Sequence, residues 1–207
     1  MGPMRAHGAA LVEELRAHVA DERVLEAIAR VPRDVFVPAD QRAHAWENAP
    51  LPIGAGQTIS QPLVVARMCE LLAPGPGDHV LDVGTGSGYH AAVLAALSGH
   101  VWSIERHPEL TRTAGRALEE AGVRNVTLLE GDGSLGHLGA APYDAINVAA
   151  AAWRAVPPAL EEQVAPGGRL VVPVMRRRQR LVLVRRTSAG IERRVLDPVR
   201  FVPLVSG

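Results

Sequence analysis

The stretch that most constrains the fold is residues 79–97, which read HVLDVGTGSGYHAAVLAAL. The first five residues are an apolar run with one acid near its end, which predicts a strand. Three glycines at alternate positions then predict a tight turn, and the Ala- and Leu-rich run over residues 91–97 favours a helix. A strand, a glycine turn and a helix in this order form the first half of a nucleotide-binding βαβ unit. We therefore expect an α/β fold with a doubly wound sheet.

The spacing of the glycines narrows the choice of ligand. The dinucleotide fingerprint is G-x-G-x-x-G and holds a pyrophosphate at the start of the helix. Here the turn is G-x-G-x-G, and Asp82 stands two residues before its first glycine. An acid at that place disfavours a diphosphate and suits a ligand that carries an ammonium group and a ribose, as S-adenosylmethionine does. The alternative is a tight turn that binds nothing.

Composition excludes several classes of protein. Basic and acidic residues number 22 each, so no net charge draws the chain to nucleic acid or to a membrane. The single cysteine, Cys69, excludes an intrachain disulfide and a cysteine-based metal site, and its apolar neighbours predict that it is buried. The histidines lack metal-ligand spacing, so we expect no metal, and we place His90 on a helix surface. With no signal-like or membrane-spanning apolar run, we expect the protein to be cytoplasmic. We also expect it to be a monomer.

Around this unit, strands and helices alternate. Helices are expected over residues 9–19, 24–31, 63–72, 108–121 and 156–163. Asp21 is expected to cap the second of these helices, and Ser60 the third. Residues 33–38 suggest an extended link, 41–48 one or two helical turns, and 50–62 a loop, since prolines and glycines break the pattern. Further strands are expected over residues 101–105, 126–130, 143–148, 169–174, 181–184 and 195–204, the last two as an antiparallel hairpin.

Two acids follow the next expected strands. Glu105 ends the second strand, where a carboxylate can accept hydrogen bonds from both ribose hydroxyls. Asp132 stands between glycines after the third strand, where it suits an adenine amino group or an ordinary Asp-Gly turn. Residues 149–152 are all alanine and can pass beneath a ligand. Residues 175–180 contain four arginines, for which a solvated loop is a better interpretation than phosphate contacts.

Together these motifs closely resemble the protein-L-isoaspartate O-methyltransferase family, from about Val24 to the end of the chain. The most specific match is the GAGQTISQP run over residues 54–62, preceded by PLPI. Others are LDVGTGSGY at 81–89, GDG at 131–133, APYDAI at 141–146, PGG at 166–168 and VRFVPL at 199–204. Asn147 and Ala149 depart from the family, which usually has an apolar residue and a threonine there. Residues 175–180 replace a glycine-containing loop.

The resemblance implies a mostly parallel, seven-stranded Rossmann-like methyltransferase sheet with a C-terminal antiparallel hairpin. One domain, 1–207, would comprise a helical cap and substrate loop, 1–62, and a core that binds S-adenosylmethionine, 63–207. The implied reaction is methylation of the free α-carboxylate of L-isoaspartyl residues in damaged proteins and peptides, with S-adenosylhomocysteine as product. The family would use Ser60 as catalytic residue and Gln57, Thr58, Ile59 and Ser60 to bind substrate. The implied cofactor-binding residues are Asp82, Gly84, Thr85, Gly86, Ser87, Gly88, Glu105, Asp132 and Gly133.

This chemistry suits the residues present. A carboxylate is already ionised at neutral pH, so catalysis needs in-line placement and desolvation rather than a strong base. The Ser60 hydroxyl can orient that carboxylate by a hydrogen bond.

Two other interpretations of the function stay open. One is a carboxylate methyltransferase of the same fold that acts on a dedicated peptide or a small molecule. The other is a cofactor-binding module whose Arg176–Arg180 cluster docks RNA.

Overall fold

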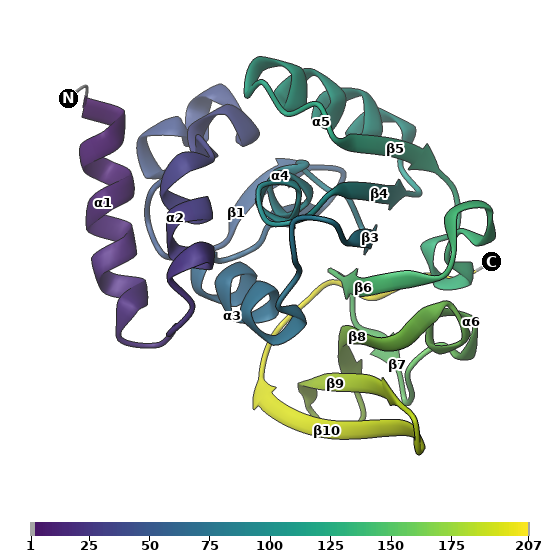
Figure 1. The fold of residues 1–207 in the computed structure, drawn as a ribbon. Helices are drawn as coiled ribbons and strands as arrows, with labels where there is room; N and C mark the ends of the chain where they lie inside the picture. Colours follow the sequence, from purple (N-terminus) through teal and green to yellow (C-terminus); the bar gives the residue numbers. More distant parts are fainter. Residues whose placement is uncertain (1–2, 207) are drawn as a thin grey trace.

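A long twisted sheet runs through the structure, a computed structural model that describes residues 3–206 and the side chains of residues 8–206 (Figure 1). Within these residues the sheet has eight strands, of which seven follow the path β10-β9-β8-β6-β3-β4-β5 and β7 pairs with β8 outside it. The strands are β3 (His79–Val83), β4 (His100–Glu105), β5 (Val126–Glu130), β6 (Tyr143–Val148), β7 (Ala152–Trp153), β8 (Val164–Met175), β9 (Gln179–Thr187) and β10 (Gly190–Pro198). Along this path, the neighbouring strands among β5, β4, β3, β6 and β8 are parallel. β9 is antiparallel to β8, and β10 is antiparallel to β9. The expected mostly parallel sheet with an antiparallel hairpin at its end is confirmed.

The order of the strands locates a binding site. From β3 the chain builds outward through β4 to β5, and it then returns to the other side of β3 with β6. The helices that follow β3 and β6 therefore leave a crevice at the carboxyl ends of these two strands. Ligands of open α/β sheets bind at such a reversal.

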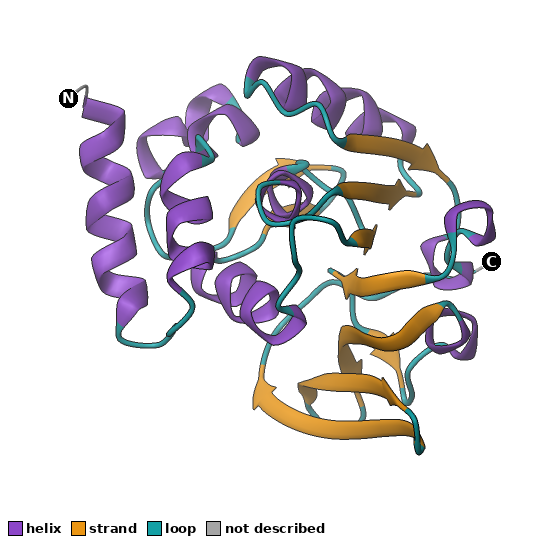
Figure 2. Ribbon diagram, viewed as in Figure 1, coloured by secondary structure: helices purple, strands orange, loops and turns teal. Residues whose placement is uncertain are grey.

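The central strands are buried on both faces, as parallel strands usually are. Val80, Val101 and Val171 belong to one apolar core, which also includes residues of the N-terminal helices, α3 (Pro62–Leu72), α4 (Tyr89–Ala95) and α5 (Pro108–Glu120). Leu81 and Leu170 belong to a second core on the other face, with α6 (Pro158–Glu162). Figure 2 shows the helices on either side of the strands. Continuous apolar runs in the sequence correspond to this two-sided burial.

The N-terminal helices α1 (Pro3–Arg16) and α2 (Glu22–Arg30) pack against each other and, through α2, against α3 and α4. Asp21 caps α2 as expected, and its side chain accepts a hydrogen bond from the Arg23 N–H at 3.0 Å. Leu15 and Ile28 are fully buried in the first core. The cap thus shares its core with the sheet. The division of the chain at residue 62 stays a prediction, and residues 1–2 and 207 lie outside the described residues.

Two segments that lead to the site differ from expectation. Residues 33–38 were expected to be extended, but Arg33–Phe36 form a 3₁₀ turn, η1, followed by a second one, η2, at Ala39–His44. Residues 50–62 were expected to be a loop, but they contain a β-hairpin of β1 (Leu51–Gly54) and β2 (Gln57–Ile59). Its two central residues both have positive φ, 49° at Ala55 and 67° at Gly56, which is the backbone of a tight hairpin turn.

The expected cap of α3 is also wrong. The helix begins at Pro62, and Ser60 lies two residues before it and makes no capping bond. Instead the Asn48 side chain accepts a hydrogen bond from the Leu63 N–H at 3.0 Å. Several bounds shift as well: α4 begins two residues early, β8 five residues early, and the last strand lies at 190–198. Cys69 is buried as expected.

Candidate active site

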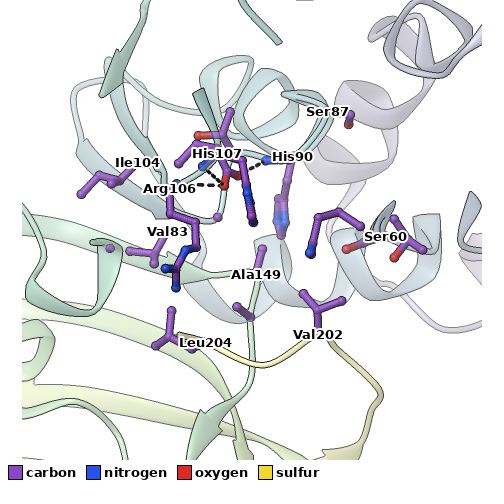
Figure 3. Close-up of a pocket in the computed structure, with 18 of the residues that line it drawn as sticks. Ser60, Val83, Ser87, His90, Ile104, Arg106, His107, Ala149, Val202 and Leu204 are labelled. Carbon is purple, nitrogen blue, oxygen red and sulfur yellow. Dashed lines mark hydrogen bonds between the residues drawn. The ribbon is translucent and has the colours of Figure 1, made fainter. Parts of the chain in front are cut away.

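The pocket at the strand reversal collects residues from six separate parts of the chain, which lie within 57–65, 83–90, 104–107, 131–133, 149–150 and 202–205 (Figure 3). The β1–β2 hairpin forms one wall, the glycine turn forms the floor, and the C-terminal segment 202–205 lies opposite. Ten residues named by the sequence line it: Gln57, Thr58, Ile59, Ser60, Gly84, Thr85, Gly86, Ser87, Glu105 and Gly133. Three others, Asp82, Gly88 and Asp132, are not among its lining residues. The structure thus brings the expected substrate loop and cofactor turn to one cavity.

The glycine turn needs its glycines for two different reasons. Gly84 and Gly86 have φ of 93° and 53° and line the pocket, where they leave space that a side chain would occupy. Gly88 has φ of 89°, and a Cβ there would lie 3.2 Å from the Cβ of Ala114 on α5. Gly88 therefore permits close packing of α5 behind the site and does not form part of the pocket surface.

Glu105 lies at the carboxyl end of β4, where its carboxylate both lines the pocket and holds the turn. One carboxylate oxygen accepts from the Gly86 N–H at 2.9 Å. The other accepts from the N–H groups of Arg106 at 2.8 Å and His107 at 3.0 Å. Three backbone donors fix its position, so a ligand that reaches Glu105 meets a preorganised acceptor.

Asp82 lies directly beneath the turn and is fully buried. Its two oxygens accept from Asn147 Nδ2 and from Ser103 Oγ, each at 2.7 Å. The Ser103 hydroxyl is also 2.6 Å from Thr85 Oγ1, on the pocket floor. Burial raises the pKa of Asp82 to about 6, while the bonds from Asn147 and Ser103 act in the opposite direction. Asp82 thus supports the glycine turn from below.

The network continues into the core through His90. Asn147 Nδ2 lies 3.2 Å from His90 Nδ1, and His90 Nε2 lies 3.6 Å from the Cys69 sulfur. This arrangement fits a neutral imidazole that accepts at Nδ1 and carries its hydrogen on Nε2. Burial lowers the pKa of His90 to about 3 and raises the pKa of the Cys69 thiol. The expected surface position of His90 is wrong, because every residue of α4 is buried.

Ser60 is positioned from behind by a buried arginine. The guanidinium of Arg33 donates to the carbonyl oxygens of Ser60 and Ala49, each at 3.0 Å, and to that of Ala45. It also lies over the Tyr89 ring at 5.5 Å from the centroid. Burial lowers the pKa of Arg33 to about 10. The Ser60 hydroxyl makes no hydrogen bond to any described residue, so it is available to a ligand in the pocket.

Asp132 takes the local role that an Asp-Gly turn suggests. One of its oxygens accepts from the N–H and the hydroxyl of Ser134, at 2.9 and 2.7 Å, and so caps the short turn η3 (Gly133–Leu135). Its neighbours Gly131 and Gly133 line the pocket. A Cβ at Gly133 would lie 2.5 Å from Val83 Cγ1, so only glycine fits there without a shift.

Sequence reasoning missed part of the pocket surface. Tyr89, Arg106, His107 and the segment 202–205 line the pocket without having been assigned to it. The segment is held by an isolated parallel bridge: the Ala151 N–H donates to the Val202 carbonyl and the Leu204 N–H to the Ala151 carbonyl, both at 2.8 Å. The sequence signal that marks this segment is the VRFVPL motif, which ends at residue 204.

In the described part of the chain, no three His, Cys, Asp or Glu residues gather as metal ligands, and no helix is long and apolar enough to cross a bilayer.

Comparison with known proteins identifies the family. The family model for protein-L-isoaspartate(D-aspartate) O-methyltransferase matches residues 6–207. A protein-L-isoaspartate O-methyltransferase from Methanothrix thermoacetophila is 52% identical over 198 residues, 94% of this chain and 93% of the relative. One from Aeromonas hydrophila is 51% identical over 189 residues, 91% of this chain and 92% of the relative.

Solved structures agree. A protein-L-isoaspartate O-methyltransferase structure aligns with a TM-score of 0.87 and 27% identity over 97% of this chain and 66% of its own. Another, from Plasmodium falciparum in complex with S-adenosyl-L-homocysteine, aligns with a TM-score of 0.82 and 25% identity over 95% of this chain and 97% of its own. The strand order, the glycine turn and the hairpin that carries Ser60 therefore have a common explanation: the chain belongs to the protein-L-isoaspartate O-methyltransferase family.

Proposed function

We propose that this chain transfers a methyl group from S-adenosylmethionine to the free α-carboxylate of L-isoaspartyl residues in damaged proteins and peptides. The observation that carries the proposal is the shared pocket: the hairpin with Ser60 and the glycine turn with Glu105 face one cavity. Family membership over residues 6–207 supports the same reaction. S-adenosylhomocysteine is then the second product.

The pocket residues fit the cofactor. Gly84 and Gly86 leave room along the floor, and Glu105 presents a fixed carboxylate at the end of β4 that can accept from ribose hydroxyls. Val83 and Ile104 add apolar surface, which suits an adenine face. Bound here, S-adenosylmethionine supplies a methyl group on a positively charged sulfur. Gly133 completes the cofactor wall, while Asp82, Gly88 and Asp132 support it from outside.

The hairpin residues are proposed to position the substrate. A substrate carboxylate attacks as the anion, so this chain needs to orient it and exclude water, with no proton to remove. The Ser60 hydroxyl can donate to one carboxylate oxygen and so aim the other at the methyl group. Arg33 holds the Ser60 carbonyl from the far side of the hairpin, which fixes the backbone that carries this hydroxyl. Gln57, Thr58 and Ile59 supply the neighbouring wall.

The same proposal covers the organisation of the protein. The hairpin, the glycine turn and Glu105 of a single copy already surround the pocket, so the proposed mechanism as a monomer requires no residue from a second copy. The helical cap and the sheet share one apolar core, which supports a single domain with the cap and hairpin in 1–62 and the cofactor core in 63–207. A lone cysteine kept as a buried thiol is compatible with a reducing cytoplasm.

Ser60→Ala tests the catalytic assignment. Loss of one hydrogen bond to a charged group costs about 1.5–3 kcal/mol, so kcat/KM for an isoaspartyl peptide should fall by about ten- to a hundredfold. Affinity for S-adenosylmethionine, measured by calorimetry, should stay at the wild-type value, as should the unfolding temperature, because Ser60 does not cap α3. The exposed Ser188→Ala variant is the matched control.

The substrate is tested in the same assay. The isoaspartyl peptide should release methanol from its labile ester, and its normal aspartyl twin should not be methylated. Wild-type turnover by Ser60→Ala would remove Ser60 from catalysis while leaving the reaction intact. Absence of methylation of the isoaspartyl peptide by the wild-type protein would overturn the function itself.

A further inference from the structure

A second hollow lies outside the active site, lined by residues of α6 and of the strands β8 to β10. It measures about 940 Å³ and shares no lining residue with the active-site pocket. Its aliphatic lining includes Val156, Val174 and Val182, which form a largely buried floor, and Val195, which is 57% exposed. This surface, called the arginine groove below for its rim, suits aliphatic side chains of a partner.

The rim of the groove is positively charged, because most of its arginines have no carboxylate partner among the described residues. Arg193 is paired with Glu161, Nε to Oε1 at 2.6 Å. The other four arginines that line the groove make no ion pair with a carboxylate of the described residues: Arg176, Arg177, Arg178 and Arg180. Two of them are held by the backbone, since Arg176 Nε donates to the Arg154 carbonyl at 3.1 Å and Arg180 Nε to the Leu196 carbonyl at 2.7 Å. The chain as a whole is neutral, so this is a local excess of positive charge.

The groove lies on the same edge of the sheet as the active site. Arg176–Arg178 follow the carboxyl end of β8, and β8 runs parallel to β6, whose carboxyl end leads into the site. Between them, β7 pairs with the last residues of β8, and Ala151 just before it is bridged to the segment 202–205 that lines the pocket. A polypeptide that leaves the active site along this edge therefore passes the groove.

We propose that the arginine groove binds an acidic, leucine- or valine-containing segment of the substrate polypeptide, adjacent to the isoaspartyl residue that is methylated. The proposal rests on the proposed function. Unpaired guanidinium groups favour carboxylates, which they can bind bidentately, and the valines favour aliphatic side chains. An acidic peptide is favoured over single-stranded RNA because none of the described residues that line the groove is aromatic. Exposed Trp153 lies beside the groove, paired with Met175, so RNA binding is kept as an outcome of the test. The groove thus raises affinity for acidic substrates without touching the reacting atoms.

Kinetics with two matched peptides test this. One is a short neutral isoaspartyl peptide, and the other carries the same core joined through a glycine-serine spacer to a Glu/Leu tail. In the wild type at low salt the tail should lower KM by about tenfold with kcat unchanged, and about 0.5 M salt should abolish the gain, since it screens charge pairs. The triple variant Arg176→Ser, Arg177→Ser, Arg178→Ser should lose the gain and still methylate the short peptide with wild-type kcat and KM. The control variant Arg112→Ser, Arg116→Ser, Arg124→Ser removes three exposed arginines outside the groove and should keep it.

The outcomes separate the two proposals. A tail that brings no gain in the wild type, or a gain that survives in the triple variant, overturns the groove while methylation of the short peptide upholds the function. If no peptide is methylated, fluorescence anisotropy of the labelled tail alone still tests the groove, with binding in the control variant and none in the triple variant expected. Tighter binding of a single-stranded RNA oligonucleotide than of the tail would overturn an acidic peptide as the occupant.

Discussion

At the scale of residues, two buried charges at the site have no ion-pair partner of opposite sign among the described residues. Arg33 is held by backbone carbonyls, and Asp82 by an amide and a hydroxyl. Burial shifts each pKa toward the neutral form, to about 10 for Arg33 and about 6 for Asp82. An arginine at such a value stays protonated near neutral pH, whereas Asp82 titrates close to it. Of these two residues, Asp82 is therefore the one whose protonation can make the stability of the protein depend on pH near neutrality.

The stability contributed by Asp82 should depend on pH. Its pKa is raised from 3.8 to about 6, so the folded protein holds this proton more tightly than the unfolded chain does. The contribution is fully present below about pH 3.8 and is lost as pH rises through about 6, a change of about 3 kcal/mol. Urea unfolding of the wild type and of Asp82→Asn should therefore show a difference in unfolding free energy that changes by about this amount between about pH 4 and pH 7.5.

The comparison with Asp82→Asn is needed because other carboxylates titrate in the same range. Asp40→Asn, at an exposed aspartate in η2, controls for the loss of one carboxyl group. A difference between wild type and Asp82→Asn that stays constant with pH would mean that Asp82 is ionised throughout and that water reaches it.

At the scale of elements, sequence prediction was most accurate for strands of the parallel sheet. The bounds of β3, β5 and β6 were predicted to the residue, because each is an apolar run between turn signals. The β1–β2 hairpin was missed because its short strands contain a proline and a glycine, and its pairing depends on the turn at Ala55 and Gly56. His90 was misplaced because a helix buried on all sides has no apolar stripe to reveal its orientation.

The cap of α3 shows why local patterns were insufficient here. Asn48 reaches the start of the helix from fifteen residues earlier in the chain, so nothing next to the helix identifies it. Its amide also donates to Glu14 on α1 at 2.8 Å. Asn48 thus links the N-terminal helix α1 to the start of α3. Ser60 was the better candidate by sequence position, and the fold instead turns its hydroxyl toward the pocket.

Removal of this distant cap should destabilise the protein. Asn48→Ala leaves the Leu63 N–H without its acceptor, which should lower the unfolding free energy by about 1 kcal/mol. Asn48→Asp in a Glu14→Gln background retains an acceptor for the Leu63 N–H without placing two carboxylates against each other, and it should recover most of the loss. Thermal or urea unfolding measures both variants, beside Ser60→Ala, which should be close to the wild type. If Ser60→Ala were the less stable of the two alanine variants, the assignment of the cap would be wrong.

At the scale of the whole molecule, the motifs predicted the family, the fold and the two main walls of the pocket. They did not predict the third wall, because the segment 202–205 is brought to the site by the path of the chain through β8, β9 and β10. Its position depends on contacts made far apart in the sequence: the Phe201 N–H donates to the Gln179 side chain at 2.6 Å, and the Gln179 amide donates back to the Phe201 carbonyl at 2.9 Å. The VRFVPL motif marks this segment, but no local pattern specifies where the segment lies.

Removal of this wall should weaken cofactor binding more than folding. A chain ending at Phe201 retains the Gln179 contacts but lacks the segment 202–205. Loss of its apolar contacts should raise the Kd for S-adenosylmethionine by about tenfold, or about 1.4 kcal/mol, measured by calorimetry. The unfolding temperature of the ligand-free protein should drop by only a few degrees, since most of the segment's side chains lie at the edge of the core. Unchanged affinity would show that this segment covers the pocket without contacting the cofactor.

The buried pair of Cys69 and His90 has a practical consequence for labelling the walls of the pocket. The chain has one cysteine, and burial keeps its thiol protonated and out of reach of solvent. The folded wild-type protein should therefore be inert to maleimide reagents without any substitution of its native cysteine. A cysteine introduced at exposed Ala55 in the hairpin turn, or at exposed Val205, would then take up a spectroscopic label at that position alone. The response of each wall of the pocket to added ligand could be measured separately in an otherwise native protein.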